Sequence, residues 1–179
     1  MSRFSIVMNA GLAGALTLAL AACSPAFNWR EVRPDGTRLN LLLPCKPDKV
    51  QKLVPLGGQA TSLSMLGCDA GGATFAVAVA DVGDPAQAAP VLALWQDLTL
   101  ANMKAAAGSR QPLALKIPGA AAGQPVVRLQ ALGQRADGVA VSSQAAYFAQ
   151  GSQLFQVVMY APQLAPEVAE TLFSSLKFE

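Results

Sequence analysis

The stretch Thr74-Phe75-Ala76-Val77-Ala78-Val79-Ala80 is the clearest strand pattern in the sequence. Successive side chains of a β-strand point to opposite faces, so the large residues share one face and the alanines share the other. Small side chains let a neighbouring element approach closely. The pattern therefore predicts a strand with an element such as a helix packed on its alanine face.

Toward the N-terminus, this strand is preceded by a hairpin and two further strands. Asp69-Ala70-Gly71-Gly72 has the composition of a tight hairpin turn. Ala60–Cys68 and Lys49–Val54 alternate in polarity, and Gly57-Gly58 separates them. Leu39–Leu43 is a short apolar strand that ends at a proline. We expect these segments to form antiparallel neighbours of the opening strand.

Toward the C-terminus, the sequence predicts two helices around a three-stranded meander. Asp84-Pro85 is a helix start, because Asp caps a helix and Pro suits its first position. The expected core stripe of that helix, which Gly108 would end, consists of Val91, Leu94, Trp95, Leu98 and Ala101. Leu113–Ile117 is a short expected strand in the long connection that follows. The expected meander strands and final helix are Val126–Gln134, Val139–Phe148, Leu154–Tyr160 and Glu167–Phe178.

This order of elements indicates an α+β fold, with an antiparallel β-sheet flanked by a mid-chain helix and a C-terminal helix. A first strand ending in proline, two hairpin strands, a long helix, a meander and the closing "LFSSLKF" resemble the PsbP-like fold. That resemblance covers about residues 38–178. It implies a sandwich whose known members mostly bind or assemble with other proteins and catalyse no reaction.

The N-terminal segment reads as a leader. Arg3 is followed by an uncharged apolar run to Ala22, the pattern of a secretory signal peptide. Leu20-Ala21-Ala22-Cys23 resembles the lipobox of bacterial lipoprotein precursors, in which the cysteine is lipidated and becomes the first mature residue. An ordinary signal peptide and an uncleaved membrane anchor are the alternatives. We expect a signal peptide over 1–22, a lipid-anchored tether over 23–37 and one α+β domain over 38–179.

The lipobox resemblance also implies a location. Diacylglyceryl and acyl groups on Cys23 would hold the protein on a membrane, since two or more chains anchor stably. Ser24 is not the aspartate that favours retention at the inner membrane, so the periplasmic face of the outer membrane is expected. Six basic residues between Arg30 and Lys52 suggest either attraction to anionic lipid or scattered solvated charges.

Composition excludes several kinds of chemistry. The chain has no histidine, which removes the usual general base and metal ligand. The 13 Lys and Arg residues nearly balance 11 Asp and Glu residues, so nothing suggests a nucleic-acid partner. We expect no catalytic residue, metal or cofactor. A carboxylate-pair hydrolase remains an alternative, and it would require two acids facing each other across a cleft.

Cys45 and Cys68 are the two cysteines left after the lipobox. In an oxidising compartment two cysteines most often pair, and neither a C-x-x-C motif nor a complete zinc ligand set is present. The sequence therefore predicts a Cys45–Cys68 disulfide.

We expect the domain to act as a non-catalytic binding or assembly module for another envelope protein. Carriage of an apolar ligand is an alternative, which a cavity between sheet and helix would favour. The exposed face of the meander is the predicted partner surface. Its candidate residues are Arg128, Gln130, Tyr147 and Tyr160.

Overall fold

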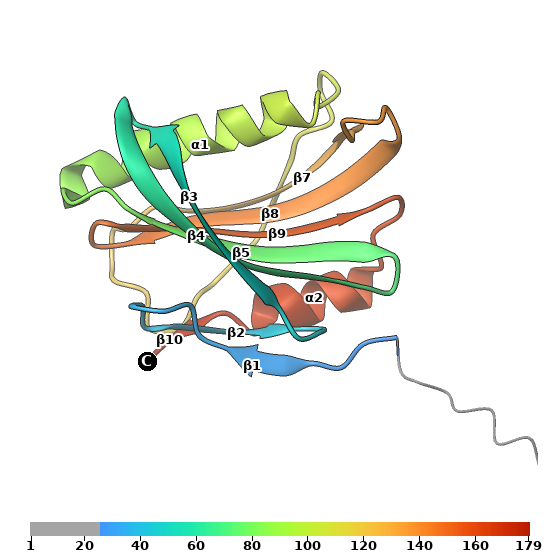
Figure 1. The fold of residues 1–179 in the computed structure, drawn as a ribbon, viewed down its shortest axis with the longest axis horizontal. Helices are drawn as coiled ribbons and strands as arrows, with labels where there is room; N and C mark the ends of the chain where they lie inside the picture. Colours follow the sequence, from blue (N-terminus) through green and yellow to red (C-terminus); the bar gives the residue numbers. More distant parts are fainter. Residues whose placement is uncertain (1–25) are drawn as a thin grey trace, which may run out of the picture.

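The computed structural model describes residues 26–179, which form a large and a small antiparallel sheet with two α-helices (Figure 1). The large sheet has the strand order β3-β4-β5-β9-β8-β7-β6, and the small sheet has the order β1-β2-β10. The elements are β1 (Arg30–Val32), β2 (Leu39–Leu43), β3 (Asp48–Leu56), β4 (Gln59–Ala70), β5 (Ala73–Asp81), the 3-10 turn η1 (Pro85–Gln87), α1 (Ala88–Asn102), β6 (Gln111–Leu113), β7 (Val126–Gln134), β8 (Ala140–Gln150), β9 (Gln153–Ala161), α2 (Pro166–Ser174) and β10 (Lys177–Phe178).

The molecule has three layers. Helix α1 lies along one face of the large sheet, and α2 lies with the small sheet against the other face (Figure 1). Each face has its own apolar core, and both cores are built from residues in the described part of the chain. The predicted α+β class, with one helix in mid-chain and one near the C-terminus, is confirmed.

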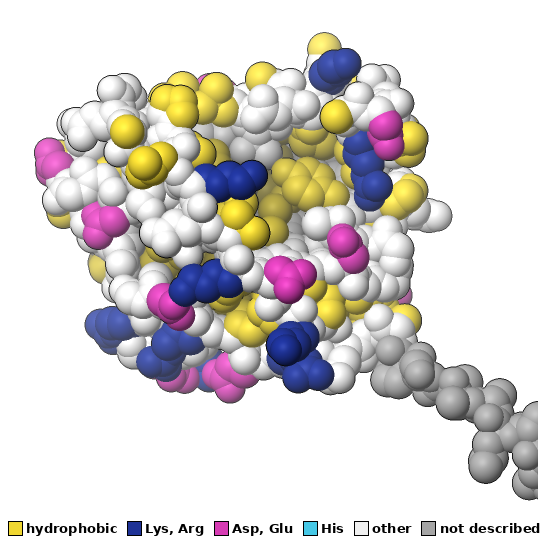
Figure 2. Space-filling view, viewed as in Figure 1, with side chains coloured by type: hydrophobic (Ala, Val, Ile, Leu, Met, Phe, Trp, Pro, Cys, Tyr) yellow, Lys and Arg dark blue, Asp and Glu magenta, His cyan; other side chains and the backbone are white. Residues whose placement is uncertain are grey.

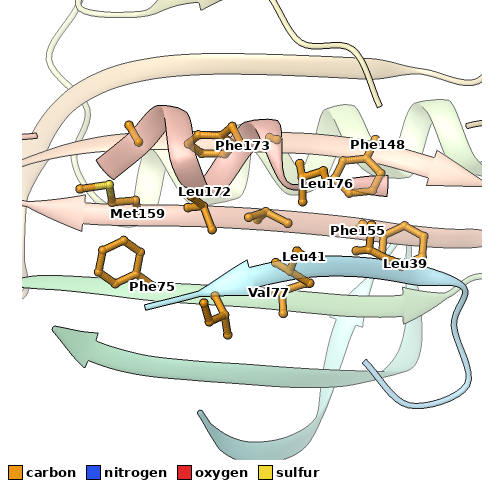
Figure 3. Packing of buried hydrophobic residues seen from close by; sticks show 14 of the residues in the cluster. Leu39, Leu41, Phe75, Val77, Phe148, Phe155, Met159, Leu172, Phe173 and Leu176 are labelled. Atoms are coloured by element: carbon orange, nitrogen blue, oxygen red, sulfur yellow. The ribbon is translucent and has the colours of Figure 1, made fainter. Parts of the chain in front are cut away.

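Strand β5 lies in the large sheet between β4 and β9, and its two faces follow the predicted alternation. Phe75 and Val77 are fully buried among Leu41, Leu172 and other side chains of the α2 side (Figure 3). The alanines belong to the core that includes α1. The small residues of β5 therefore face the α1-side core, although the strands that α1 itself approaches most closely are β8, β3 and β9.

The disulfide joins the two sheets. Cys45 follows β2 of the small sheet, and Cys68 lies in β4 of the large one. Their Cα atoms are 6.0 Å apart, within the usual range for a bonded pair. The predicted Cys45–Cys68 bond is thus present.

The start of the domain differs from the prediction. We expected a tether over 23–37, but Arg30–Val32 form β1, which pairs with β2. Phe27 and Trp29 pack on Phe75, with ring centroids 6.4 Å and 6.5 Å away. The folded domain therefore begins about ten residues earlier than expected, because these aromatic rings cover an otherwise open part of the core.

Both predicted helices are corrected in extent. Helix α1 ends at Asn102, short of Gly108, and α2 ends at Ser174. After α2 the chain extends into β10, which pairs with β2 and places Phe178 against the rings of Phe148 and Phe155. Burial of that ring in the core favours an extended ending over further helical turns.

The buried face of α1 is also different from the predicted stripe. Val91 and Trp95 are buried as expected, but Leu94 and Leu98 are each 42% exposed. Ala101, the last residue of the predicted stripe, is exposed as well. Ala88, Leu92 and Gln96 are buried in their place. Eleven of the 15 positions of this helix are apolar, and they lie on all of its sides, so the periodicity alone does not select the buried face. Within residues 26–179, no helix is both long and apolar enough to cross a membrane.

Candidate ligand-binding groove

A groove of about 450 Å³ opens between α1 and the large sheet. Figure 2 shows this face of the molecule hollowed, with hydrophobic side chains inside the hollow and Lys and Arg side chains on its rim. The second half of α1, the turn between β7 and β8, and strands β5, β8 and β9 supply the walls. The lining residues are Thr74, Trp95, Thr99, Asn102, Met103, Gln134, Arg135, Ala136, Val141, Gln156 and Tyr160.

Gln156 of β9 fixes the floor of the groove to the helix above it. Its side-chain amide donates to the Thr99 hydroxyl across 2.9 Å and to the Tyr147 hydroxyl across 3.1 Å. Thr99 in turn donates to the backbone carbonyl of Trp95 across 2.9 Å. These bonds satisfy polar groups that would otherwise be costly beside an apolar core.

One end of the groove is set by a close backbone approach between β7 and the end of α1. The Gln134 N–H donates to the Met103 carbonyl across 2.7 Å, which ties β7 to the end of α1. A Cβ atom on Gly133 would lie 2.2 Å from the Met103 carbonyl oxygen, so only glycine fits at this position. This contact places the β7–β8 turn beside Asn102.

The two tyrosines on this side of the sheet stay protonated at neutral pH. Burial raises the pKa of Tyr160 to about 12, and the nearby Tyr147 adds to the rise. Burial also raises the pKa of Tyr147, against the lowering effect of its hydrogen bonds. Tyr160 therefore presents the groove with a neutral hydroxyl that can donate a hydrogen bond.

The predicted partner surface is wrong, because its four residues do not share one exposed face. Tyr147 is only 2% exposed and lies in the α1-side core. Tyr160 is partly buried and packs against the same core. Arg128 lies on the opposite face, 9% exposed and 4.2 Å from the ring centroid of Phe173 in α2. Gln130 bonds with Gln144 on that face. Helix α2 covers what we expected to be open sheet.

Arg128 is instead part of a structural polar cluster beneath α2. Its guanidinium donates to Gln144 across 2.8 Å and approaches Glu170 at 3.4 Å. Its Nε is buried without a hydrogen-bond partner among residues 26–179. A cation stacked on an aromatic ring and bonded to an amide is well placed to hold α2 on the sheet.

The acidic side chains lie at the surface, and part of the basic segment pairs with them. All eleven Asp and Glu side chains belong to exposed residues, and none of them lines the groove. Asp84 accepts a hydrogen bond from the Ala86 N–H and so caps the helix start as expected. In the basic segment, Arg33 pairs with Glu179 and Lys49 pairs with Asp35. Part of that predicted positive patch is therefore neutralised by neighbouring acids.

Cys23, the predicted lipidation site, lies outside the described residues. The first described residue, Ala26, is three positions further along the chain, and the fold begins immediately after it.

Sequence reasoning did not identify the groove. Its polar lining comes from side chains that form no motif, namely Thr74, Thr99, Asn102, Gln134, Arg135 and Gln156. One signal was present: Gln156 falls on the face of its strand that otherwise carries apolar side chains. A polar residue at such a position indicates a hydrogen-bonded group inside the fold.

No protein-family model matches the chain, and no relative was found among curated proteins. Among solved structures, the chain is similar to a protein from Bacteroides thetaiotaomicron, with a TM-score of 0.43 and 13% identity over 79% of this chain and 45% of that one. It is also similar to PA94, a protein of unknown function from Pseudomonas aeruginosa, with a TM-score of 0.34 and 14% identity over 75% of this chain and 83% of that one. The chain thus spans less than half the length of the Bacteroides protein. Neither likeness assigns a family or a function.

Proposed function

We propose that this protein is a lipid-anchored envelope protein whose domain binds a small ligand without catalysing a reaction. The observation that carries the binding role is the groove between α1 and the sheet. It has the size and the mixture of aromatic and polar lining typical of small-molecule sites. Its lining contains hydroxyl, amide and guanidinium groups but no carboxylate.

The anchor rests on Leu20-Ala21-Ala22-Cys23, and the location at the periplasmic face of the outer membrane rests on Ser24. The PsbP-like architecture is part of the same proposal. It is supported by the order of elements along the chain: β2, the β3–β4–β5 hairpins, α1, the β7–β8–β9 meander and α2. The lipobox, Ser24 and the order of elements together support a non-catalytic domain that lipid holds close to a membrane.

Ligand binding in the groove can be tested by thermal unfolding, because a ligand of the folded state raises the unfolding temperature. Ala136 is exposed in the β7–β8 turn and lines the groove, so Ala136→Phe should narrow the site without disturbing the core. Ala122→Phe, in the exposed loop before β7, is the matched control. In a screen of small molecules, we expect some compounds to raise the unfolding temperature of the wild type and of Ala122→Phe but not that of Ala136→Phe. Equal stabilisation of all three proteins, or of none, would refute the groove as the site.

The anchor is tested by labelling cells with a radioactive fatty acid. Wild-type protein should carry the label in the membrane fraction, and Cys23→Ala should be unlabelled and remain an uncleaved precursor. Normal processing of Cys23→Ala to a soluble form would instead indicate an ordinary signal peptide.

Assembly with another envelope protein is a second candidate function. The outward face of α1 exposes Leu94 and Leu98, separated by one helical turn, with Asp97 as the one charged residue of the helix. Exposed apolar residues on one helix face are typical of protein contacts. Crosslinking in intact cells should lose a specific partner in Leu94→Ser/Leu98→Ser if this face is used.

A further inference from the structure

The groove has a single charged lining residue, Arg135. Within residues 26–179, its guanidinium takes part in no ion pair and no side-chain hydrogen bond. The turn between β7 and β8 holds its backbone, because the Arg135 N–H donates to the Val139 carbonyl and the Arg135 carbonyl accepts from the Gly138 N–H. A guanidinium without an acidic partner beside an apolar site complements one anionic group.

Two further polar residues, Asn102 and Gln134, lie beside Arg135. The bond between the Gln134 N–H and the Met103 carbonyl places Arg135 next to Asn102, the last residue of α1. The negative end of the helix dipole would normally repel an anion there. However, the carbonyls of residues 99–101 already accept backbone N–H groups of the following turn.

The remainder of the lining suits an apolar body. Trp95, Met103, Val141 and Tyr160 present aromatic, thioether and aliphatic surface along the groove. Met is adaptable in shape and packs well against ligands of irregular outline. The Tyr160 hydroxyl has no hydrogen-bond partner within the described residues, so it is free to bond to a ligand.

We propose that the groove binds an amphiphile with one carboxylate and an apolar body, with the carboxylate on Arg135 and the body along Trp95, Met103 and Val141. A single guanidinium matches a single negative charge, which favours a carboxylic acid over a phosphate monoester. This inference rests on the proposed ligand-binding function and specifies its ligand.

Tryptophan fluorescence offers a direct test, because the chain has two tryptophans and only Trp95 lines the groove. In Trp29→Phe, the remaining signal reports the site, and the aromatic contact with Phe75 is largely retained. The protein is the chain from Ser24 onward, which contains both cores. The probes are dodecanoate, octanoate and dodecanol, each below its micelle or solubility limit.

We expect dodecanoate to change the Trp95 emission in a saturable manner. Octanoate should bind more weakly, by up to about 4-fold for each methylene removed from contact. Arg135→Gln should weaken dodecanoate binding at least about 10-fold, as expected for loss of a charge-assisted pair, and leave dodecanol unchanged. Arg30→Gln, which removes an exposed arginine of β1, should leave both unchanged. If Trp29→Phe fails to fold, calorimetric titration of the chain with both tryptophans provides the same dissociation constants.

Two outcomes overturn the inference and separate it from the proposed function. The carboxylate assignment is wrong if dodecanol binds as tightly as dodecanoate, or if Arg135→Gln binds dodecanoate as tightly as the wild type. The proposed function survives that result as long as the wild-type groove binds ligands and Ala136→Phe prevents their binding. If no probe binds and no compound distinguishes Ala136→Phe from the wild type, the ligand class and the binding function both fail.

Discussion

The side-chain amide of Gln156 on β9 lies 2.9 Å from the hydroxyl of Thr99 on α1 and donates a hydrogen bond to it. This bond crosses from the sheet to the helix at the floor of the groove. The same amide also supports the buried hydroxyl of Tyr147. One polar side chain thus positions the helix that forms one wall of the site.

Gln156→Leu should destabilise the protein by about 1–3 kcal/mol, because it leaves the Tyr147 hydroxyl buried without its donor. Adding Tyr147→Phe should restore part of the loss, since the unpaired hydroxyl is then removed. Urea unfolding measures both. Gln51→Leu, on the exposed strand β3, is the control and should change stability by less than about 0.5 kcal/mol. Wild-type stability in Gln156→Leu would show that the amide does not tie the helix to the sheet.

Arg128→Ala should cost about 2–4 kcal/mol, since it loses the stacking on Phe173 and leaves Gln144 without its donor. Glu170 is 69% exposed, so Glu170→Gln should cost only about 0–1 kcal/mol. Arg30→Ala on the surface provides the comparison. A loss in Arg128→Ala no greater than in Arg30→Ala would mean that Arg128 does not hold α2 on the sheet.

Replacing both Cys45 and Cys68 with serine should lower the free energy of unfolding by about 3 kcal/mol, because the unfolded chain regains the freedom of the closed loop. Unfolding with and without a reductant provides the check. Reductant should destabilise the wild type and leave the double variant unchanged. An identical response of the two proteins would contradict a bond between the sheets.

Gly71→Ala and Gly72→Ala form a matched pair that tests the docking of Phe27. Both residues have positive φ, +57° and +76°, so each alanine should cost about 1–2 kcal/mol of backbone strain. At Gly71, however, a Cβ atom would lie 2.4 Å from the Phe27 ring, whereas at Gly72 it would meet nothing within 4 Å. Gly71→Ala should therefore be less stable by chemical denaturation, and a Phe27→Ala background should remove the difference. If Gly71→Ala and Gly72→Ala lose the same stability in the wild-type background, Phe27 does not pack against Gly71.

The sheet could be predicted from the sequence because its signals are local. The alternation along Phe75–Val79 and the glycine pairs at 57–58 and 71–72 specify strands and hairpins without reference to distant residues. The disulfide followed from the small number of cysteines. These features depend on residue patterns that favour the same local structure in almost any fold.

The covering of each face could not be predicted in the same way. Arg128 and Gln130 look like an exposed polar face until α2 is known to lie over them. Helix α1 is apolar on nearly all sides, so nothing in its pattern indicated that Leu98 faces outward. The groove is a consequence of where α1 ends on the sheet, and that depends on the close contact at Gly133.

The most direct test of a lipid-anchored protein with a ligand in the groove is native mass spectrometry of the full-length product extracted from membranes in a mild detergent. We expect a chain beginning at lipidated Cys23 that carries one small molecule, which is released on unfolding and is absent from Ala136→Phe. A chain without lipid, or a bound molecule retained equally in Ala136→Phe, would contradict this assignment.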